Sequence, residues 1–257
     1  MSEVVQLDQL LPAILFVGVR IGGVMTFAPF LSSDAIAPQL KAAFTVALTA
    51  LLYPVAGIAG LTVGAPGWLR IVAAEAVIGL ALGLTLQIIF EAAQMAGNIV
   101  GVQTGFSLVT LLDPQSQADS PVMTVFHQLM TLLIFLHLHV DHWLLRGLTA
   151  SFAYLPPGSS LSAPALGVAL LHAAGSIWLV GVEIAAPVLL ATVMADVALG
   201  FLGKASPQLP VIFVGLSIKT LLGLAVLAGS LTMWPRFFEK RFASALLVGE
   251  HMLHLAR

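Results

Sequence analysis

The sequence predicts an all-α protein that crosses a membrane several times. Hydrophobic residues make up 59% of its 257 residues and charged residues only 9%, whereas about a quarter of an ordinary soluble domain is charged. The mean hydropathy of +1.04 leaves too few polar residues to cover a soluble surface. Apolar runs recur along the chain and are long enough for membrane helices, each of which needs about 20 mostly apolar residues.

Six apolar runs are the expected spanning helices. Between the third and fourth runs lies Glu91–Leu112, which is helical in character but poorer in large apolar residues. The fifth run would be about 55 Å long at 1.5 Å per residue, beyond a bilayer core of about 30 Å. We expect it either to break near Pro187 or to project beyond the bilayer. The six runs are Leu10–Leu31, Ala42–Val63, Trp68–Phe90, Val122–Leu145, Leu166–Leu202 and Leu209–Trp234.

The polar segments between the runs are short. Leu155–Pro164 is a turn-rich linker, and Gly203–Pro207 joins the last two long runs into a predicted helical hairpin. After Trp234, apolar residues recur at helical spacing among charges, which predicts an amphipathic helix on the membrane surface or on a partner. The basic residues of this tail predict a cytoplasmic position by the positive-inside rule.

The composition excludes several classes of function. A net charge of −2 gives no electrostatic case for binding nucleic acid. The absence of cysteine removes disulfides, zinc-thiolate sites and thiol nucleophiles. The sequence shows neither a glycine-rich phosphate loop nor a nucleophile paired with a base. An intramembrane hydrolase is therefore only a remote alternative, because the sequence has no convincing nucleophile, and we expect no cofactor.

Five ionisable residues lie inside apolar runs, where an ionised group costs at least about 2.5–3.5 kcal/mol if it faces lipid. We expect them to be buried against protein or water. The favoured interpretation is ion pairing that fixes the register between helices, and the alternative is a proton or ion relay. The five residues are Arg20, Glu75, Glu183, Asp196 and Lys219.

Small residues form a stripe along one expected helix. Gly97, Gly101 and Gly105 follow Ala93 at four-residue steps, and Gly79 and Gly83 repeat the spacing. Such a stripe lets another helix backbone approach closely. It predicts tight helix packing, although glycine also weakens a helix and could mark a segment that moves.

The segment Gly105–Pro121 is the predicted functional loop. Its Asp-Pro and Ser-Pro pairs end helices, and a non-helical backbone at membrane depth has to be satisfied by water or protein. Its first half is apolar and its second half is polar. It is either a passive loop outside the membrane or a re-entrant loop that plugs a pore.

Three histidines and an aspartate, HLHVDHW, resemble a metal-binding cluster. Helical spacing places His137 and Asp141 on one face and points His139 away. The end of an apolar run also suits residues at the membrane interface, with Trp143 at the headgroups. We therefore expect no metal site here.

Five stretches together resemble the flagellar biosynthetic protein FliR family, whose members are membrane components of the type III protein export gate. Virulence-type secretion homologues share this plan, and the flagellar branch is favoured. Two residues depart from the family pattern: Lys204 stands where the turn usually has arginine, and Pro210 where a polar residue is common. The stretches are Arg20–Pro54, Glu75–Leu84, Ala96–Val122, Leu148–Pro156 and Ala198–Lys219.

The resemblance implies a subunit and not an enzyme, namely a structural subunit of a multi-subunit export gate, built from helical hairpins in the bacterial inner membrane at the flagellar basal body. The expected partners are FliP, FliQ, FlhB and FlhA, with unfolded flagellar proteins as transient substrates. It implies a FliP-like part at 1–155, a linker at 156–164, a FliQ-like hairpin at 165–234 and the amphipathic tail at 235–257. The alternative is a self-contained proton-coupled transporter of small solutes.

The resemblance also assigns roles to particular residues. The loop would be the plug that closes the channel until substrate arrives, and the turn between the last two runs would carry Lys204, Pro207 and Gln208. The expected plug residues are Phe106, Ser107, Leu108, Leu111, Leu112, Asp113, Pro114 and Pro121.

Overall fold

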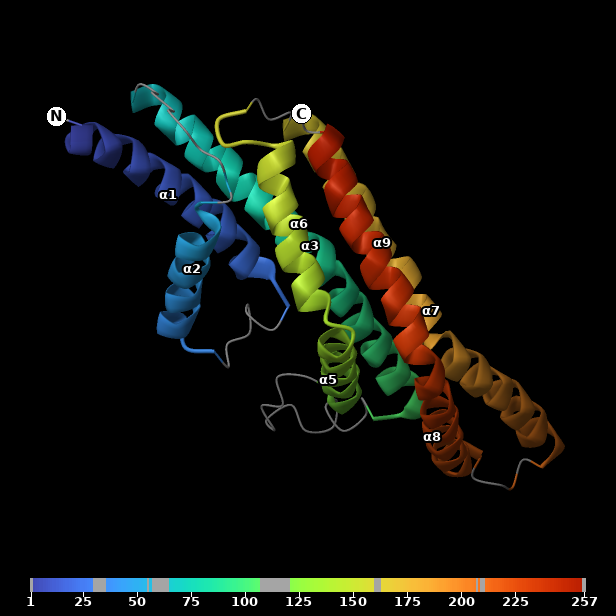
Figure 1. Cartoon of the computed structure of the whole chain (residues 1–257). Coiled ribbons are helices and arrows are strands. Elements are labelled where there is room, and N and C mark those ends of the chain that lie inside the picture. The colour runs from blue at the N-terminus through green and yellow to red at the C-terminus, as the bar shows by residue number, and fades with distance from the viewer. Residues whose placement is uncertain are drawn as a thin grey trace. The chain divides into compact units, whose positions relative to one another are not determined.

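A computed structural model describes residues 2–29, 36–54, 56, 65–106, 121–159, 163–206, 208 and 211–255. Helices account for all regular structure in these residues, which confirms the all-α prediction. Figure 1 shows the helices in chain order. They are α1 (Ser2–Phe27), α2 (Pro38–Leu52), α3 (Ala65–Thr104), α5 (Val122–His137), α6 (Val140–Tyr154), α7 (Ala163–Ala205), α8 (Val211–Ser230), the short 3-10 helix η1 (Leu231–Met233) and α9 (Trp234–Leu255).

Within the described residues, three helical stretches are long and apolar enough to cross a membrane, and α5 with α6 form a fourth if the broken pair is one span. This confirms a polytopic membrane protein. Within the described residues, two further apolar helices are shorter: Pro12–Phe27 of α1 and the whole of α2. The C-terminal ends of the first two predicted spans lie outside the described residues. The three long stretches are Gly67–Thr104, Leu166–Ala205 and Val214–Met252.

Two helices, α3 and α7, are about twice as long as the bilayer core is thick. The predicted third span and the segment after it form one continuous helix, α3, of 40 residues. Helix α7 has 43 residues and continues through Pro187, although a proline inside a helix removes one backbone hydrogen bond. At 1.5 Å per residue α7 is about 65 Å long. The fifth apolar run is expected either to break near Pro187 or to project beyond the bilayer. The structure has one unbroken helix here.

The predicted fourth span is broken. Helix α5 ends at His137, and His139 has a φ of 53°, in the left-handed region. Residues other than glycine rarely adopt this conformation, and histidine does so more often than most. The sequence gives no glycine or proline signal for this break.

The chain divides into two compact units. Unit 1 is Met1–Ile88, His139–Ala174 and Phe242–Arg257, and unit 2 is Ile89–Leu138 and Gly175–Arg241. The division falls inside α3, α7 and α9, so each unit draws on residues from both sides of the linker. The division at 156–164 into FliP-like and FliQ-like parts stays a prediction.

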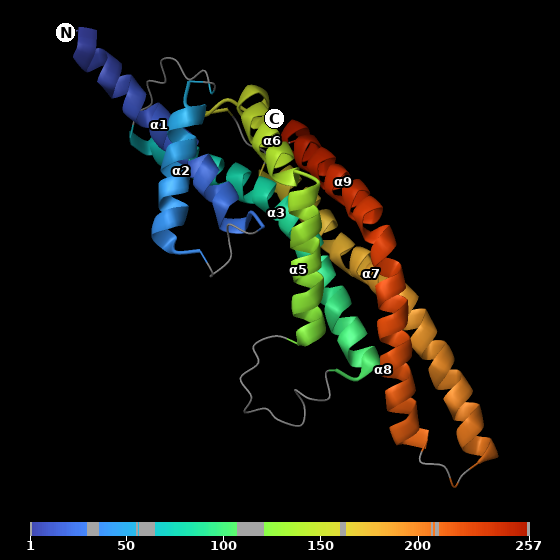
Figure 2. The ribbon, with the colours of Figure 1, turned by 60° about the horizontal axis from the view of Figure 1, so that its bottom comes forward.

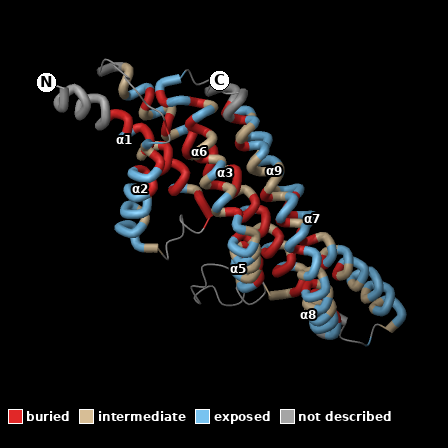
Figure 3. The backbone as a smooth tube through the Cα atoms, viewed as in Figure 1, coloured by how far each residue is buried: buried red, intermediate tan, exposed pale blue. Residues whose placement is uncertain are grey.

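Within unit 2, the second half of α7 and α8 lie antiparallel as the predicted hairpin, and Figures 1 and 2 show them side by side. A Cβ on Gly215 of α8 would lie 3.0 Å from a methyl carbon of Leu199 on α7. Figure 3 shows most of α8 exposed or half-buried in the chain. This hairpin therefore buries one narrow face and leaves the rest of its apolar surface uncovered.

Helix α9 is the predicted amphipathic tail, but its apolar face is buried within the chain. Phe238 and Phe242 are 0% exposed. In unit 2, the ring of Trp234 lies 5.1 Å from that of His127 on α5. In unit 1, a Cβ on Gly249 would contact Thr85 of α3 at 3.5 Å. The expectation that this face rests on the membrane surface or on a partner is wrong, because the face already packs against other helices of the same chain.

Candidate functional site

A buried ion pair joins α1 and α3 in unit 1. The Nε atom of Arg20 donates a hydrogen bond to Oε2 of Glu75 at 2.6 Å, and the two side chains are 0% and 2% exposed. Two charges removed from water are tolerated only when their remaining hydrogen-bonding atoms also find partners. Arg20 and Glu75 are therefore buried and paired within the chain itself.

Helix α6 supplies those further partners. Nη1 of Arg20 donates to the Ser151 hydroxyl at 3.0 Å, and Nη2 donates to the Leu155 carbonyl at 2.7 Å. The guanidinium carbon lies 4.3 Å from the ring centre of Phe152. One planar guanidinium thus ties three helices together, which lysine, with a single ammonium group, would not reproduce.

Glycines allow α1 and α3 to meet backbone to backbone beside this ion pair. A Cβ on Gly79 would overlap the carbonyl oxygen of Arg20, and one on Gly83 would lie 2.8 Å from the carbonyl oxygen of Val24. On the other helix, a Cβ on Gly23 would lie 2.9 Å from the carbonyl oxygen of Ala76. Any larger residue would separate the helices, so the glycine spacing sets the distance between them.

In unit 2, the second half of α3 makes a similar contact with the start of α5. A Cβ on Gly97 would lie 2.6 Å from the Cα of Thr124, whose hydroxyl donates to the Asn98 side-chain oxygen at 3.0 Å. Gly101 is buried. Gly105, expected to be a packing residue, instead follows the end of α3 with a φ of 84°. Glycine is the usual residue at a helix end in this left-handed conformation.

The C-terminal end of α3 is fixed to the hairpin of unit 2. The Thr220 hydroxyl on α8 donates to the Thr104 carbonyl at 2.7 Å, and the Thr192 hydroxyl on α7 lies 3.5 Å from the Gln103 side-chain oxygen. A Cβ on Gly223 would overlap the methyl group of Thr104. The chain therefore leaves α3 from a position that two other helices hold.

The predicted plug begins and ends next to these two contacts. Phe106 and Pro121 are half-buried, and Pro121 caps the start of α5. The other predicted plug residues lie outside the described residues. They are Ser107, Leu108, Leu111, Leu112, Asp113 and Pro114.

The other predicted buried charges pair on the surface of unit 2. Lys219 of α8 donates to Asp196 of α7 at 2.8 Å, with side chains 19% and 50% exposed. Arg241 of α9 donates to Glu183 of α7, whose side chain is 37% exposed. Asp196 and Glu183 are thus not buried within this chain, and their shelter by other polypeptides stays a prediction. Each of these carboxylates, like Glu75, has a basic partner on another helix, which fits pairs that fix register.

Two residues of the predicted hairpin turn are described, and both are exposed. Lys204 lies in the last turn of α7, and Gln208 lies between the two helices. Pro207 lies outside the described residues.

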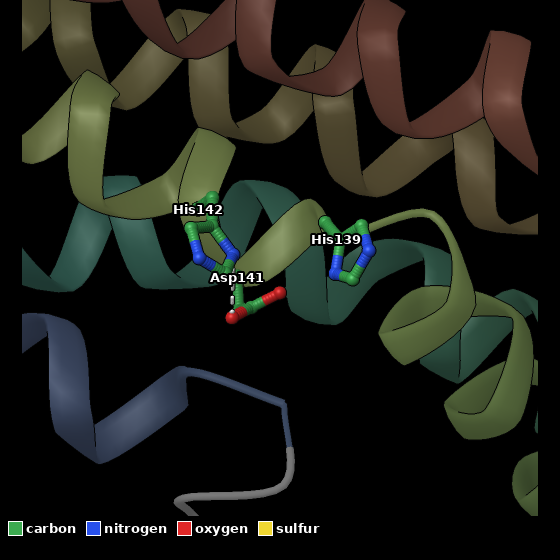
Figure 4. Close-up of side chains that lie close together, drawn as sticks. All are labelled: His139, Asp141 and His142. Atoms are coloured by element: carbon green, nitrogen blue, oxygen red, sulfur yellow. Dashed lines mark ion pairs between the residues drawn. The ribbon is translucent and has the colours of Figure 1, made fainter.

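His139, Asp141 and His142 form a cluster in unit 1 (Figure 4). Each offers one ligand atom, and these atoms all lie within 4.8 Å of one another. The expectation that His139 points away from the other ligands is wrong, because helical periodicity does not continue through the break at His139. His137 is exposed and is not part of this group.

Sequence reasoning missed the partners of the charged residues. One of the stretches that resemble the family, Leu148–Pro156, contains Ser151, Phe152 and Leu155. Nothing in the sequence assigned these three residues a role. Arg241 counted only toward the positive charge of the tail. The five embedded residues include three acids but only two bases. This imbalance was a usable signal that one of the acids pairs with a base outside this set, which the structure identifies as Arg241.

Comparison with known proteins gives one family. The family described as bacterial export proteins, family 1, matches residues 11–245. The chain is 29% identical over 224 residues to the flagellar biosynthetic protein FliR of Escherichia coli K12, covering 87% of this chain and 86% of that protein. It is 33% identical over 150 residues to FliR of Bacillus subtilis, covering 56% and 57%. It is 24% identical over 231 residues to FliR of Caulobacter vibrioides, covering 88% and 91%.

Proposed function

The chain belongs to the bacterial export proteins, family 1, and on that premise we propose that it is a structural subunit of the flagellar-type protein export gate in the bacterial inner membrane. Its similarity over most of its length to proteins named FliR supports the flagellar apparatus. Its long apolar helices support a membrane location. The role is to form and close a pore rather than to catalyse a reaction.

The observation that carries the proposal is a charged pair on the uncovered surface of the hairpin. Asp196 is half-exposed although its neighbours on α7 are apolar, and Met194 and Phe201 are 72% and 69% exposed. An exposed apolar surface of this kind needs lipid or protein to cover it. An ionised group facing lipid costs several kcal/mol, about 2.5–3.5 on the insertion scale. Neighbouring subunits packed on the hairpin would cover the exposed apolar side chains and would also keep the ion pair out of contact with lipid.

The segment Gly105–Pro121 is the plug in this proposal. Both of its flanks are anchored in unit 2, at Thr104 through Thr220 and at Thr124 through Asn98. Fixed flanks restrict where the intervening residues reach, as a closing element requires. The apolar residues up to Leu112 would fill the channel, and the polar residues from Asp113 onward would anchor them.

The proposed neighbours are FliP, FliQ, FlhB and FlhA, with unfolded proteins as the passing substrates. The contrasting function is a self-contained proton-coupled transporter. The contacts favour the transporter less. Its proton-carrying carboxylate would be Glu75, but this side chain is paired with Arg20 in a buried site. Reconstitution of the chain alone separates the two functions, since only a transporter moves a small solute unaided.

Deletion of Gln115–Ser120 tests the plug assignment. The assembled complex should still form, because the anchoring contacts at Thr104 and Thr124 remain. Cells that express the variant should leak ions across the inner membrane. Full assembly with unchanged conductance would remove the plug from the proposal.

A further inference from the structure

The cluster at the start of α6 brings together two imidazoles and a carboxylate within four residues. The rings of His139 and His142 have centroids 5.6 Å apart, and Nδ1 of His142 lies 2.9 Å from Oδ2 of Asp141. Figure 4 shows Asp141 between the two rings. The proposed export function uses none of these residues.

The local backbone produces this arrangement. His139 is the only non-glycine residue with a positive φ in the described part of the chain, and it is the N-cap of α6. Asp141 and His142 follow in the first turn of the same helix. The imidazole of the capping residue therefore lies beside the side chains of the first helical turn, and all three belong to unit 1.

The ligand types select a class of metal. Imidazole nitrogen with carboxylate oxygen suits zinc and neighbouring transition metals such as cobalt and nickel. Calcium and magnesium prefer oxygen ligands alone. Two histidines and one carboxylate leave further coordination positions for water, as in open zinc sites.

Access and charge also bear on the site. The side chains of His142 and Asp141 are 65% and 44% exposed in the chain, so the chain itself leaves room at the ion for further ligands such as water. The positive end of the α6 dipole opposes a cation at this position. The negative charge of Asp141 offsets that opposition, which makes this carboxylate essential to affinity.

We propose that His139, Asp141 and His142 bind one divalent transition-metal ion, with water completing its coordination. Because Asp141 and His142 are already in contact, the ion replaces that contact instead of gathering side chains from solvent. The bound ion ties the left-handed residue to the first turn of α6. The site uses neither of the described residues that border the predicted plug, Phe106 and Pro121.

The test uses the full-length chain, purified in mild detergent with the subunits that accompany it, through a tag without histidine. Equilibrium dialysis against zinc, followed by elemental mass spectrometry, gives the zinc bound per chain. His139→Gly removes the imidazole and suits the positive φ, so it does not disturb the backbone. Asp141→Asn removes the charge at nearly the same volume. His137→Ala is the matched control, an exposed histidine two residues before the cluster.

The expected result is one zinc ion per chain in the wild type and in His137→Ala, with binding at least about tenfold weaker in both cluster variants, the scale on which even outer-shell changes act. Cobalt added in place of zinc should give a visible absorption band that the cluster variants lose. Three outcomes overturn the proposal: no saturable binding to the wild type, equal binding to His139→Gly, or an equal loss in His137→Ala.

Discussion

The carbonyl oxygen of Arg20 on α1 lies where a Cβ on Gly79 of α3 would be, one helical turn beyond the ion pair between Arg20 and Glu75. The close approach and the ion pair depend on each other. A wider separation would lengthen the 2.6 Å contact between Arg20 and Glu75. A missing ion partner would leave a charge between two tightly packed helices.

Replacing Gly79 with alanine should destabilise the protein, because the new methyl group overlaps the backbone of α1. Overpacking of this kind typically costs about 1–3 kcal/mol. Thermal unfolding in detergent measures the effect. Gly167→Ala is the control, since nothing lies within 4 Å of its Cβ position. An equal response of the two variants would show that the contact at Gly79 is unimportant.

Glu75→Gln should be more damaging, because it leaves the Arg20 guanidinium charged and unpaired in the core. Breaking a buried ion pair from one side costs about 3–5 kcal/mol. The double variant Arg20→Met with Glu75→Leu should recover part of the loss, and not all of it, because Ser151 and the Leu155 carbonyl lose their donor. Chemical denaturation of the three proteins provides the comparison. A double variant no more stable than Glu75→Gln would contradict this account of the pair.

Gly97→Ala should loosen the second anchor of the plug. Its Cβ would lie 2.6 Å from the Cα of Thr124, so α3 and the start of α5 have to separate. We expect a partial ion leak without loss of assembly, smaller than that of the deletion. Gly229→Ala in the same unit is the control, because its Cβ position is open. Membrane conductance equal to that of the control would argue against this anchor.

Much of the fold was predictable from composition and spacing. Long apolar runs predicted the helices, and the polar residues between the last two runs predicted the hairpin of α7 and α8. The predicted third run ends at Phe90, because a charge and fewer large apolar residues follow it, whereas α3 continues as one helix through this point. Glu91 is exposed, and the alanines and glycines that follow it pack closely against other helices.

The partners of the embedded charges could not be predicted in the same way. Ser151 and Leu155 lie 131 and 135 residues from Arg20, and a single sequence contains no distance across such separations. The break at His139 was also hidden, because a left-handed histidine has no signature within an apolar run. The sequence therefore indicated which residues need partners, and the structure identified those partners.

The central claim is that the uncovered hairpin and its charged pair are sheltered by other polypeptides of the export gate. Affinity purification of the tagged chain from its native membrane in mild detergent, with mass spectrometry of the accompanying proteins, tests this most directly. The account predicts a stable complex that contains FliP-like and FliQ-like subunits. A stable monomer surrounded by lipid, which carries solutes without any other protein, would contradict it.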